Sequence, residues 1–584
     1  MSHKIRKKID NEFTIPAGAN IAKSNAVYIN HGTTEVVSKK TGKSYRAHKK
    51  VCIGVAILDE NGHRTDKMYG NDNYYRLFHI DFLPDPPERA DSISVGPMLV
   101  TKFLAQNSGL TDCLNKTFSD QETNLILDLA TYMLNTESAV FQHFPAWARR
   151  HALFSLSIRS DSYISRFLCS SLTVSKINSF KNDWAKLNIG SGNVFLCYDS
   201  TNVNSQAEGV CLVQKGHAKD DNSLTQVNSD YVIRQEDGLP LTFSEFPGSI
   251  VDIAEASEML CFIKNISNKK DVHITLVCDR GYISKDNIDA MDKAKVDFLL
   301  MLKSNNLVKN TLIDDYASQI KNNYDCYMPE FDKFGACIES QLFKDNKNRY
   351  FYVIWSATLE YAHRTKLLNS IDKKFESLKK GIERNKLYTK EELSRIPEWF
   401  VIDTQADKLI QNKTTKVKDS QEMIKTFKIT QVKKDSKVIS KHLARCGFYI
   451  LVSSQKITPS EACIAYSKRD CVEKVFRALK SSLGMDKIGA STEDTIHGKS
   501  LIWFVASILY SLAFIKTITL RKEGRNPKKY SVPAIMDEID SIVADRNLRN
   551  SRYNRRYKIT KIQRDIFSAY GISCDDLDIV IEKL

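Results

Sequence analysis

Residues 193–200, NVFLCYDS, and residues 273–282, HITLVCDRGY, share one pattern, in which an apolar run ends at an aspartate. Short apolar runs rich in β-branched residues predict buried strands. The same pattern predicts strands in VDFLLML (296–302) and GFYILVS (447–453). Helical stretches separate some of these runs, for example SIVDIAEASEMLCFIKN, which begins at residue 249. Buried strands that alternate with helices indicate an α/β sheet that is covered on both faces.

Asp199 and Asp279 each end one of these strands. Ligand sites in such sheets gather at the carboxyl ends of the strands. A single aspartate at that place more often caps the next turn. Two neighbouring carboxylates, however, repel each other unless a cation neutralises them, and hard divalent ions meet that need. A two-metal site for phosphodiester chemistry would require one more carboxylate.

Residues 465–482, AYSKRDCVEKVFRALKSS, offer that carboxylate on a predicted amphipathic helix. At about 100° per residue, one polar stripe lies beside the apolar face. The stripe consists of Tyr466, Arg469, Glu473 and Lys480, with Arg477 close to it. Glu473 is the candidate third metal ligand, and the cations would hold phosphates on either side of it. The alternative is a solvated face with local salt bridges.

The composition favours an intracellular partner that carries many negative charges. Across 584 residues, 85 Lys and Arg stand against 70 Asp and Glu, which gives a formal net charge of +15. Such an excess favours nucleic acid ahead of a membrane surface. The 13 cysteines include no C-x-x-C pair, which indicates free thiols rather than disulfides or a zinc ribbon. The N-terminus shows no secretory signal, so we expect a cytoplasmic, nucleoid-associated protein.

The most apolar stretch, SLIWFVASILYSLAFI at 500–515, contains three serines. It is shorter than the roughly 20 residues that span a bilayer, so a buried helix is the better interpretation.

Changes in residue pattern divide the chain into six predicted regions. Six cations, Lys39, Lys40, Lys43, Arg46, Lys49 and Lys50, surround the first predicted hairpin turn, where they could contact phosphates or form a solvated loop. The regions are 1–110, β-rich and DNA-binding; 111–190, helical; 191–305, the first part of the sheet; 306–445, an insertion; 446–520, the second part; and 521–584, a basic C-terminal region.

Tyr466, Arg469, Glu473 and Lys480 match the Y-x2-R-x3-E-x6-K signature of a group of bacterial insertion-sequence DDE transposases at every spacing. YDST at Asp199 and VCDRGY at Asp279 resemble the first two acidic motifs of that group. Weaker blocks resemble it in KGHAKDD (215–221), GLPLTFSEFPGSIVD (238–252) and HGKSLIWFVASIL (497–509). The chain departs from its relatives at Ser249, where they commonly have Asn, and at Asp221-Asn222, where they have a basic residue.

The resemblance implies an RNase H-like mixed sheet flanked by helices and interrupted by a β-rich insertion between Asp279 and Glu473. It also implies two Mg2+ or Mn2+ ions held by Asp199, Asp279 and Glu473. Cut-and-paste transposition, terminal inverted repeats and a synaptic homodimer follow from it as well. Relatives place a tryptophan of the insertion against a flipped base. Trp355 is the candidate here, although RYFYVIWSA also fits a core strand.

Two other functions are compatible with the same residues. One is an RNase H-like nuclease that cleaves DNA without joining it to a target. The other is an inactive or domesticated transposase that only binds DNA, which the three intact acidic positions disfavour.

Overall fold

The computed structural model forms two compact units, Met1–Ala90 and Asp91–Leu584. The first unit ends before the predicted boundary at residue 110 because the helix that follows packs with the second unit. The structure describes residues 12–37, 44–78, 90, 92–155, 157–216, 224–249, 256–267, 272–303, 306–343, 345, 347–411, 423–523, 527–546 and 553–584.

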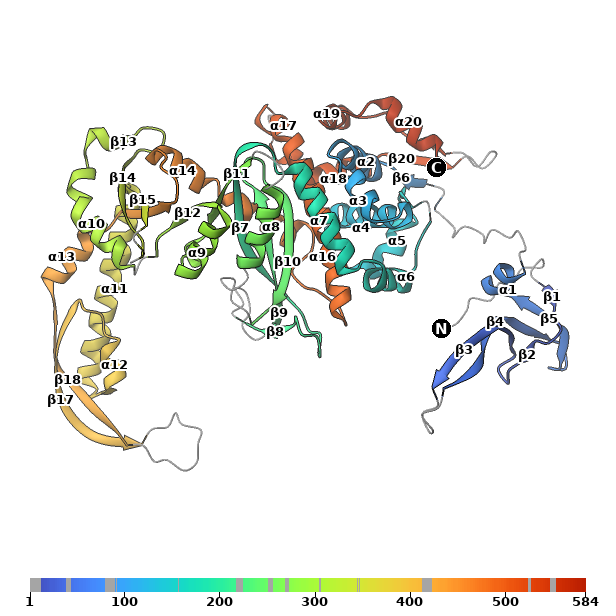
Figure 1. Ribbon diagram of the computed structural model, residues 1–584, viewed down its shortest axis with the longest axis horizontal. Helices are drawn as coiled ribbons and strands as arrows, with labels where there is room; N and C mark the ends of the chain where they lie inside the picture. Colours follow the sequence, from blue (N-terminus) through green and yellow to red (C-terminus); the bar gives the residue numbers. More distant parts are fainter. Residues whose placement is uncertain are drawn as a thin grey trace. The chain divides into compact units, whose positions relative to one another are not determined.

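The first unit is a five-stranded antiparallel sheet with one short helix, coloured blue in Figure 1. Its small core contains Val27, Ile53 and Met68. Of the six cations predicted around the first turn, Arg46, Lys49 and Lys50 are exposed, and the other three lie outside the described residues. In order, the strands are β1-β5-β4-β3-β2, with bounds β1 Glu12–Thr14, β2 Asn20–Ile21, β3 Ala26–Val37, β4 Ser44–Leu58 and β5 Arg64–Gly70, followed by α1 Asp72–Leu77.

The second unit begins with helices that pack around one very apolar helix, α16 (Glu493–Lys516). Of the described helices, α16 is the one long and apolar enough to cross a membrane, and 72% of its most apolar window is buried inside the protein. Gly498 lets α16 approach a neighbouring turn, since a Cβ there would lie 2.1 Å from the carbonyl oxygen of Leu168. The surrounding helices include α2 Gly96–Asn107, α3 Leu110–Thr117, α4 Asp120–Thr136, α5 Phe144–Ala148, α6 Asp161–Arg166 and α7 Val174–Asn188.

A large mixed sheet dominates the second unit, so the prediction of an α/β protein is confirmed. Its main path runs β10-β9-β7-β11-β12-β19-β15-β14-β13, with β8 paired to β9. The helices α7 and α16 pack on β10, α8 packs on β11, and α9 packs on β12 (Figure 1). The bounds are β7 Gly192–Asn204, β8 Gln214–Lys215, β9 Thr225–Arg234, β10 Leu239–Pro247, α8 Ala256–Ser267, β11 Val272–Cys278, α9 Lys285–Ala294, β12 Asp297–Met301, β13 Tyr327–Met328, β14 Lys333–Gln341, β15 Asn348–Trp355 and β19 Phe448–Ser453.

The predicted insertion at 306–445 is not a single β-rich body. Its strands β14 and β15 belong to the central sheet, because β15 pairs with the whole length of β19. The longest element of the insertion is a helix, α11 (Ala357–Glu383), which packs on a separate three-stranded sheet. The remaining elements are α10 Leu307–Ile320, β16 Leu387–Thr389, α12 Lys390–Ser394, β17 Phe400–Gln411, β18 Met423–Lys434 and α13 Ser436–Ala444.

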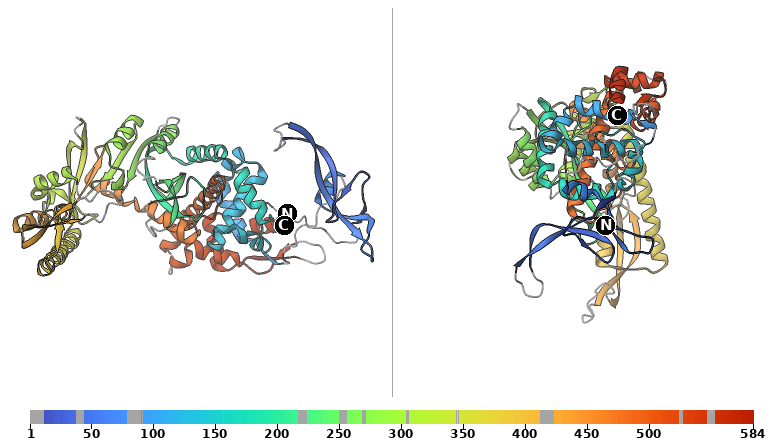
Figure 2. Two further views of the ribbon diagram at one scale, coloured as in Figure 1. Left: turned by 90° about the horizontal axis from the view of Figure 1, so that it is seen from below. Right: turned by 90° about the vertical axis from the view of Figure 1, so that its right-hand side faces the viewer.

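The C-terminal region packs back on the helices that open the second unit, as Figure 2 shows from two further directions. Strand β20 pairs with β6 and with β21, so segments from both ends of this unit form one small sheet. The bounds are β6 Ser92–Ser94, α17 Ile518–Glu523, α18 Val532–Asp540, β20 Val543–Arg546, β21 Tyr553–Arg555, α19 Lys561–Tyr570 and α20 Cys574–Glu582.

Candidate active site

The central sheet places Asp199 and Asp279 side by side, each just after the last paired residue of two adjacent parallel strands. The last parallel pair between β7 and β11 is Tyr198 with Cys278, so each aspartate follows directly. The prediction that Asp199 ends its strand is wrong. Strand β7 continues to Asn204 by pairing with β9, and Asp199 marks the point where β7 extends beyond β11.

The segment that carries Glu473 is not the single helix predicted for 465–482. It consists of α14 (Pro459–Ser467), a turn at Lys468 and Arg469, α15 (Asp470–Arg477) and a π-helical turn, Ala478–Ser482. The break arises because the amides of Arg469, Cys471 and Val472 bond to carbonyls three residues back, which tightens the turn. The uniform 100° spacing used for the stripe therefore fails on both sides of α15.

The tightened turn brings Arg469 between the carboxylates. One guanidinium nitrogen, Nη2, lies 2.9 Å from Oε1 of Glu473, and the other, Nη1, lies 3.5 Å from Oδ2 of Asp199. The side chains of Arg469 and Asp199 are mostly buried, with 16% and 17% of their surfaces exposed, whereas Glu473 is 56% exposed. Because α15 packs on β7 and β9, the glutamate reaches the edge where the two aspartates lie.

The charges around Arg469 show that all three carboxylates act on the same guanidinium. Burial by itself lowers the pKa of Arg469, but the nearby Tyr466, Asp279, Asp199 and Glu473 more than offset it and raise the pKa. Tyr466 lies beside this group, with its ring 5.8 Å from the guanidinium carbon. Burial, together with the charge of Asp279, raises the pKa of Tyr466 to about 12, so its hydroxyl is protonated at neutral pH.

The three carboxylates are ligands of the kind that a hard divalent cation takes, although they do not surround one common point. Carboxylate oxygens are the ligands that such ions prefer. The carboxylates of Asp199 and Glu473 already share one cation, the guanidinium of Arg469. Among the described residues no three His, Cys, Asp or Glu side chains are close enough to hold a metal ion. Glu473 pairs with Arg469, and more than half of its side chain is exposed to solvent.

The other predicted DNA contacts lie in different places. Lys480 is half-buried in the π-helical turn, and Arg477 is exposed on the side of α15 that lines a separate cavity. Trp355 is 6% exposed at the end of β15, where its ring packs 5.6 Å from Phe334. This placement corresponds to the core tryptophan that was the alternative interpretation, and the ammonium of Lys321 lies 4.9 Å from the centre of the ring.

A cavity of about 460 Å³ beside Tyr466 contains residues that the sequence did not single out. Lys333 donates a hydrogen bond to the hydroxyl of Tyr449 at 3.2 Å, and its ammonium lies over that ring. Burial and the neighbouring Arg280 lower the pKa of Lys309. Arg280 could have been found, since it directly follows Asp279, but the other cations come from distant segments. The aromatic and basic lining comprises Phe331, Phe448, Tyr449, Tyr466, Arg280, Lys309, Lys333 and His363.

All 13 cysteines are free, which agrees with the absence of C-x-x-C pairs. Cys278, which directly precedes Asp279, is fully buried. Burial and the charge of Asp199 raise the pKa of this thiol, as expected for a cysteine in the core.

A family model described as "Transposase DDE domain" matches residues 190–509, more than half of the chain. The chain belongs to this transposase family. The matched segment of this transposase contains both aspartates, Glu473 and the whole central sheet. Among solved structures, it is similar to a piggyBac transposase in a synaptic complex with hairpin DNA. That similarity has a TM-score of 0.34 and 9% sequence identity, over 83% of this chain and 84% of that chain. No curated protein sequence matches the transposase.

Proposed function

We propose that this transposase cuts the ends of a DNA element and joins the released 3′-hydroxyl to target DNA, as in the bacterial insertion-sequence group that its signature resembles. One observation supports this most directly. The guanidinium of Arg469 contacts both Asp199 and Glu473, and the charge of Asp279 raises its pKa. Carboxylates from three distant segments therefore lie around one cation, which supports a metal site of the kind that phosphodiester chemistry requires.

Asp199, Asp279 and Glu473 would hold two Mg2+ or Mn2+ ions. When bound, such ions lower the pKa of an attacking water or hydroxyl and stabilise the leaving oxygen. The three carboxylates position the reacting phosphate and accept no covalent bond. Arg469 would turn from the carboxylates to a phosphate oxygen, since its charge suits either partner. The hydroxyl of Tyr466, which is protonated at neutral pH, would donate a hydrogen bond to the same DNA strand.

The cavity beside Tyr466 gives the DNA strand a path away from the carboxylates. Arg280, Lys309 and Lys333 supply cations that hold phosphates. Aromatic rings in the same cavity offer surfaces on which bases can stack. Lys480 and Arg477 would serve as outer phosphate contacts, because both follow Glu473 on the same segment. Trp355 could meet a base only if the packing around it opened.

The arrangement of the sheet supports an RNase H-like core, because the two aspartates stand on adjacent parallel strands and Glu473 on a helix packed beside them. The exposed cations Arg46, Lys49 and Lys50 support DNA binding by the first unit. We also propose a homodimer that pairs two element ends, and a cytoplasmic, nucleoid-associated location that follows from the DNA substrate.

The deciding experiment is a cleavage and strand-transfer assay with the DNA that flanks the gene as substrate. Purified transposase with Mn2+ is expected to nick the element ends and then join the 3′-ends to plasmid DNA. Cleavage without joined product would instead support the nuclease. Binding of the ends without cleavage would support the inactive DNA-binding protein.

A further inference from the structure

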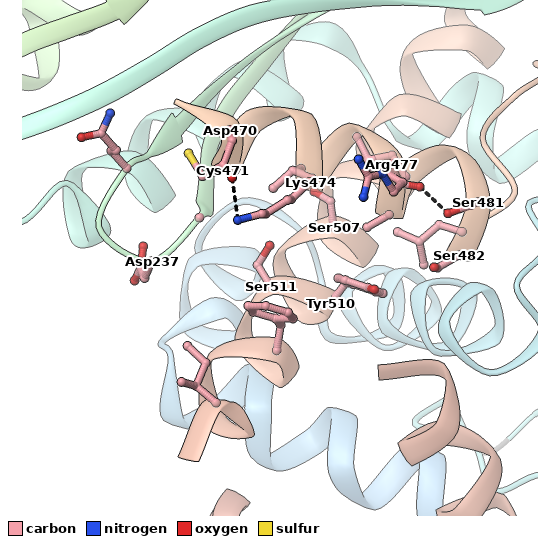
Figure 3. Close-up of a pocket in the computed structure, with 18 of the residues that line it drawn as sticks. Asp237, Asp470, Cys471, Lys474, Arg477, Ser481, Ser482, Ser507, Tyr510 and Ser511 are labelled. Atoms are coloured by element: carbon pink, nitrogen blue, oxygen red, sulfur yellow. Dashed lines mark hydrogen bonds and ion pairs between the residues drawn. The ribbon is translucent and has the colours of Figure 1, made fainter. Parts of the chain in front are cut away.

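A second cavity lies behind the helix that carries Glu473. Its volume is about 520 Å³, within the roughly 300–1,000 Å³ of pockets that bind small molecules. Helix α15 forms one wall, α16 the facing wall, and the turn between β9 and β10 closes one side. Figure 3 shows Lys474 and Arg477 on the α15 side and Ser507, Tyr510 and Ser511 on the α16 side. None of the carboxylates of the candidate active site lines it.

The entrance of this cavity is cationic. Lys468, Lys474 and Arg477 line it and are exposed. Two of the three acidic residues there are neutralised, because Asp470 pairs with Lys474 at 2.8 Å and Asp237 pairs with Arg234, whereas Glu236 is exposed at the rim. Within the described part of the chain, the side chains of Lys468 and Arg477 have no ion-pair or hydrogen-bond partner. Two cations are therefore available for an anion.

The interior of the cavity combines apolar walls with hydroxyl groups. The buried side chains of Leu479 and Val475 form an apolar wall, and Phe514 contributes an aromatic ring. Four serines, Ser481, Ser482, Ser507 and Ser511, and the phenol of Tyr510 line the same space. Ser481 and Ser507 donate to the carbonyls of Arg477 and Phe504, so their oxygens remain as hydrogen-bond acceptors that an aliphatic chain would leave unpaired.

We infer that this cavity binds a nucleotide. The phosphate would pair with Lys468 and Arg477, because a guanidinium binds phosphate oxygens in a bidentate manner. The base would lie between the apolar wall and Phe514, and the sugar and base edges would bond to the hydroxyls. The nucleotide could be free in solution or part of a DNA strand, since both carry the same chemistry.

A bound nucleotide would also hold α15 against α16. Lys474 and Arg477 lie one and four residues after Glu473, so a ligand that bridges the two helices restrains the backbone that carries the glutamate. Nucleotide binding shares only Arg477 with the proposed reaction and can be measured without metal.

The test is calorimetric titration of the full chain in EDTA with deoxyadenosine monophosphate, 2-deoxyribose 5-phosphate, inorganic phosphate and a short single-stranded oligonucleotide. Deoxyadenosine monophosphate is expected to bind saturably and more tightly than the two phosphates that lack a base. If the cavity variants weaken binding of the oligonucleotide but not of deoxyadenosine monophosphate, the nucleotide belongs to a DNA strand. If the cavity variants weaken the binding of neither ligand, the inference is wrong.

Two variants and one control make this dependence measurable. Lys468→Gln removes an exposed cation of the entrance and is expected to weaken binding about tenfold. Ser511→Phe fills the interior and should reduce nucleotide affinity to that of phosphate alone, while thermal unfolding checks that the chain is folded. Lys487→Gln removes an exposed lysine outside the cavity and should change nothing. An equal effect of Lys468→Gln and Lys487→Gln would reduce the binding to general surface charge and contradict the inference.

Discussion

Arg469 and Glu473 are joined by an ion pair of 2.9 Å across one turn of α15, and the same guanidinium reaches Asp199 on β7. An arginine in this position neutralises carboxylates that would otherwise repel one another. It also competes with any other cation for the same oxygens. The position of this one side chain therefore links the stability of the site to its occupancy by metal.

Replacing Arg469 by Gln is expected to destabilise the metal-free protein by roughly 1–3 kcal/mol, because the mostly buried carboxylate of Asp199 loses its cation. Mn2+ should restore more stability to this variant than to the wild type, since the ion no longer competes with the guanidinium. Thermal unfolding with and without Mn2+ measures both effects. Lys474→Gln breaks an exposed pair with Asp470 and serves as the control, with a change near zero. Equal Mn2+ effects in Arg469→Gln and the wild type would contradict the competition.

His497 and Glu245 form a mostly buried pair at 3.5 Å between α16 and β10. The hydrogen bond and charge of Glu245 raise the pKa of His497. Because the folded pKa lies above the unfolded value of about 6.5, this stabilisation is complete below that pH and is lost as the pH rises through the folded pKa. Denaturant unfolding from slightly acidic to alkaline pH should show the decline. Glu245→Gln should flatten it, and an unchanged slope in that variant would rule out the pair as its source.

Trp355→Ala is expected to lower the free energy of unfolding by about 3–5 kcal/mol, the cost of a large core cavity. Trp355→Phe should be milder, because an aromatic ring still fills most of the space. Affinity for the element ends, corrected for the folded fraction, should be unchanged in both variants. Normal folding combined with a selective loss of end binding would restore Trp355 as a base-accepting residue.

Lys333→Gln should weaken binding of DNA to the transposase and reduce the slope of log affinity against log salt by about 1, the loss of one phosphate contact. Fluorescence anisotropy with a labelled element end over a series of salt concentrations measures this slope. Lys347→Gln is the matched control, because that lysine is already paired with Asp292 at 2.7 Å. If the two variants have the same slope, Lys333 does not contact DNA.

The sequence predicted the strands that carry Asp199 and Asp279 because apolar runs of that length bury both faces. It also predicted the buried interior of α16. It could not predict that α14 and α15 are separate, since the turn at Arg469 depends on how each helix packs on distant strands. The pairing of β15 with β19 was equally hidden, because the two strands are far apart in the chain. Lys333 on β14 and Lys309 on α10 join the site because both elements pack on β15.

The central claim is that Asp199, Asp279 and Glu473 act together at one metal-dependent site. Single-turnover cleavage of a labelled element end by Glu473→Gln, beside the wild type and Glu376→Gln, tests it most directly. Glu376 is an exposed glutamate on α11, away from the sheet edge. Glu473→Gln is expected to lower the cleavage rate by about a thousandfold or more with end binding retained, and Glu376→Gln to match the wild type. Cleavage by Glu473→Gln at the wild-type rate would contradict the account.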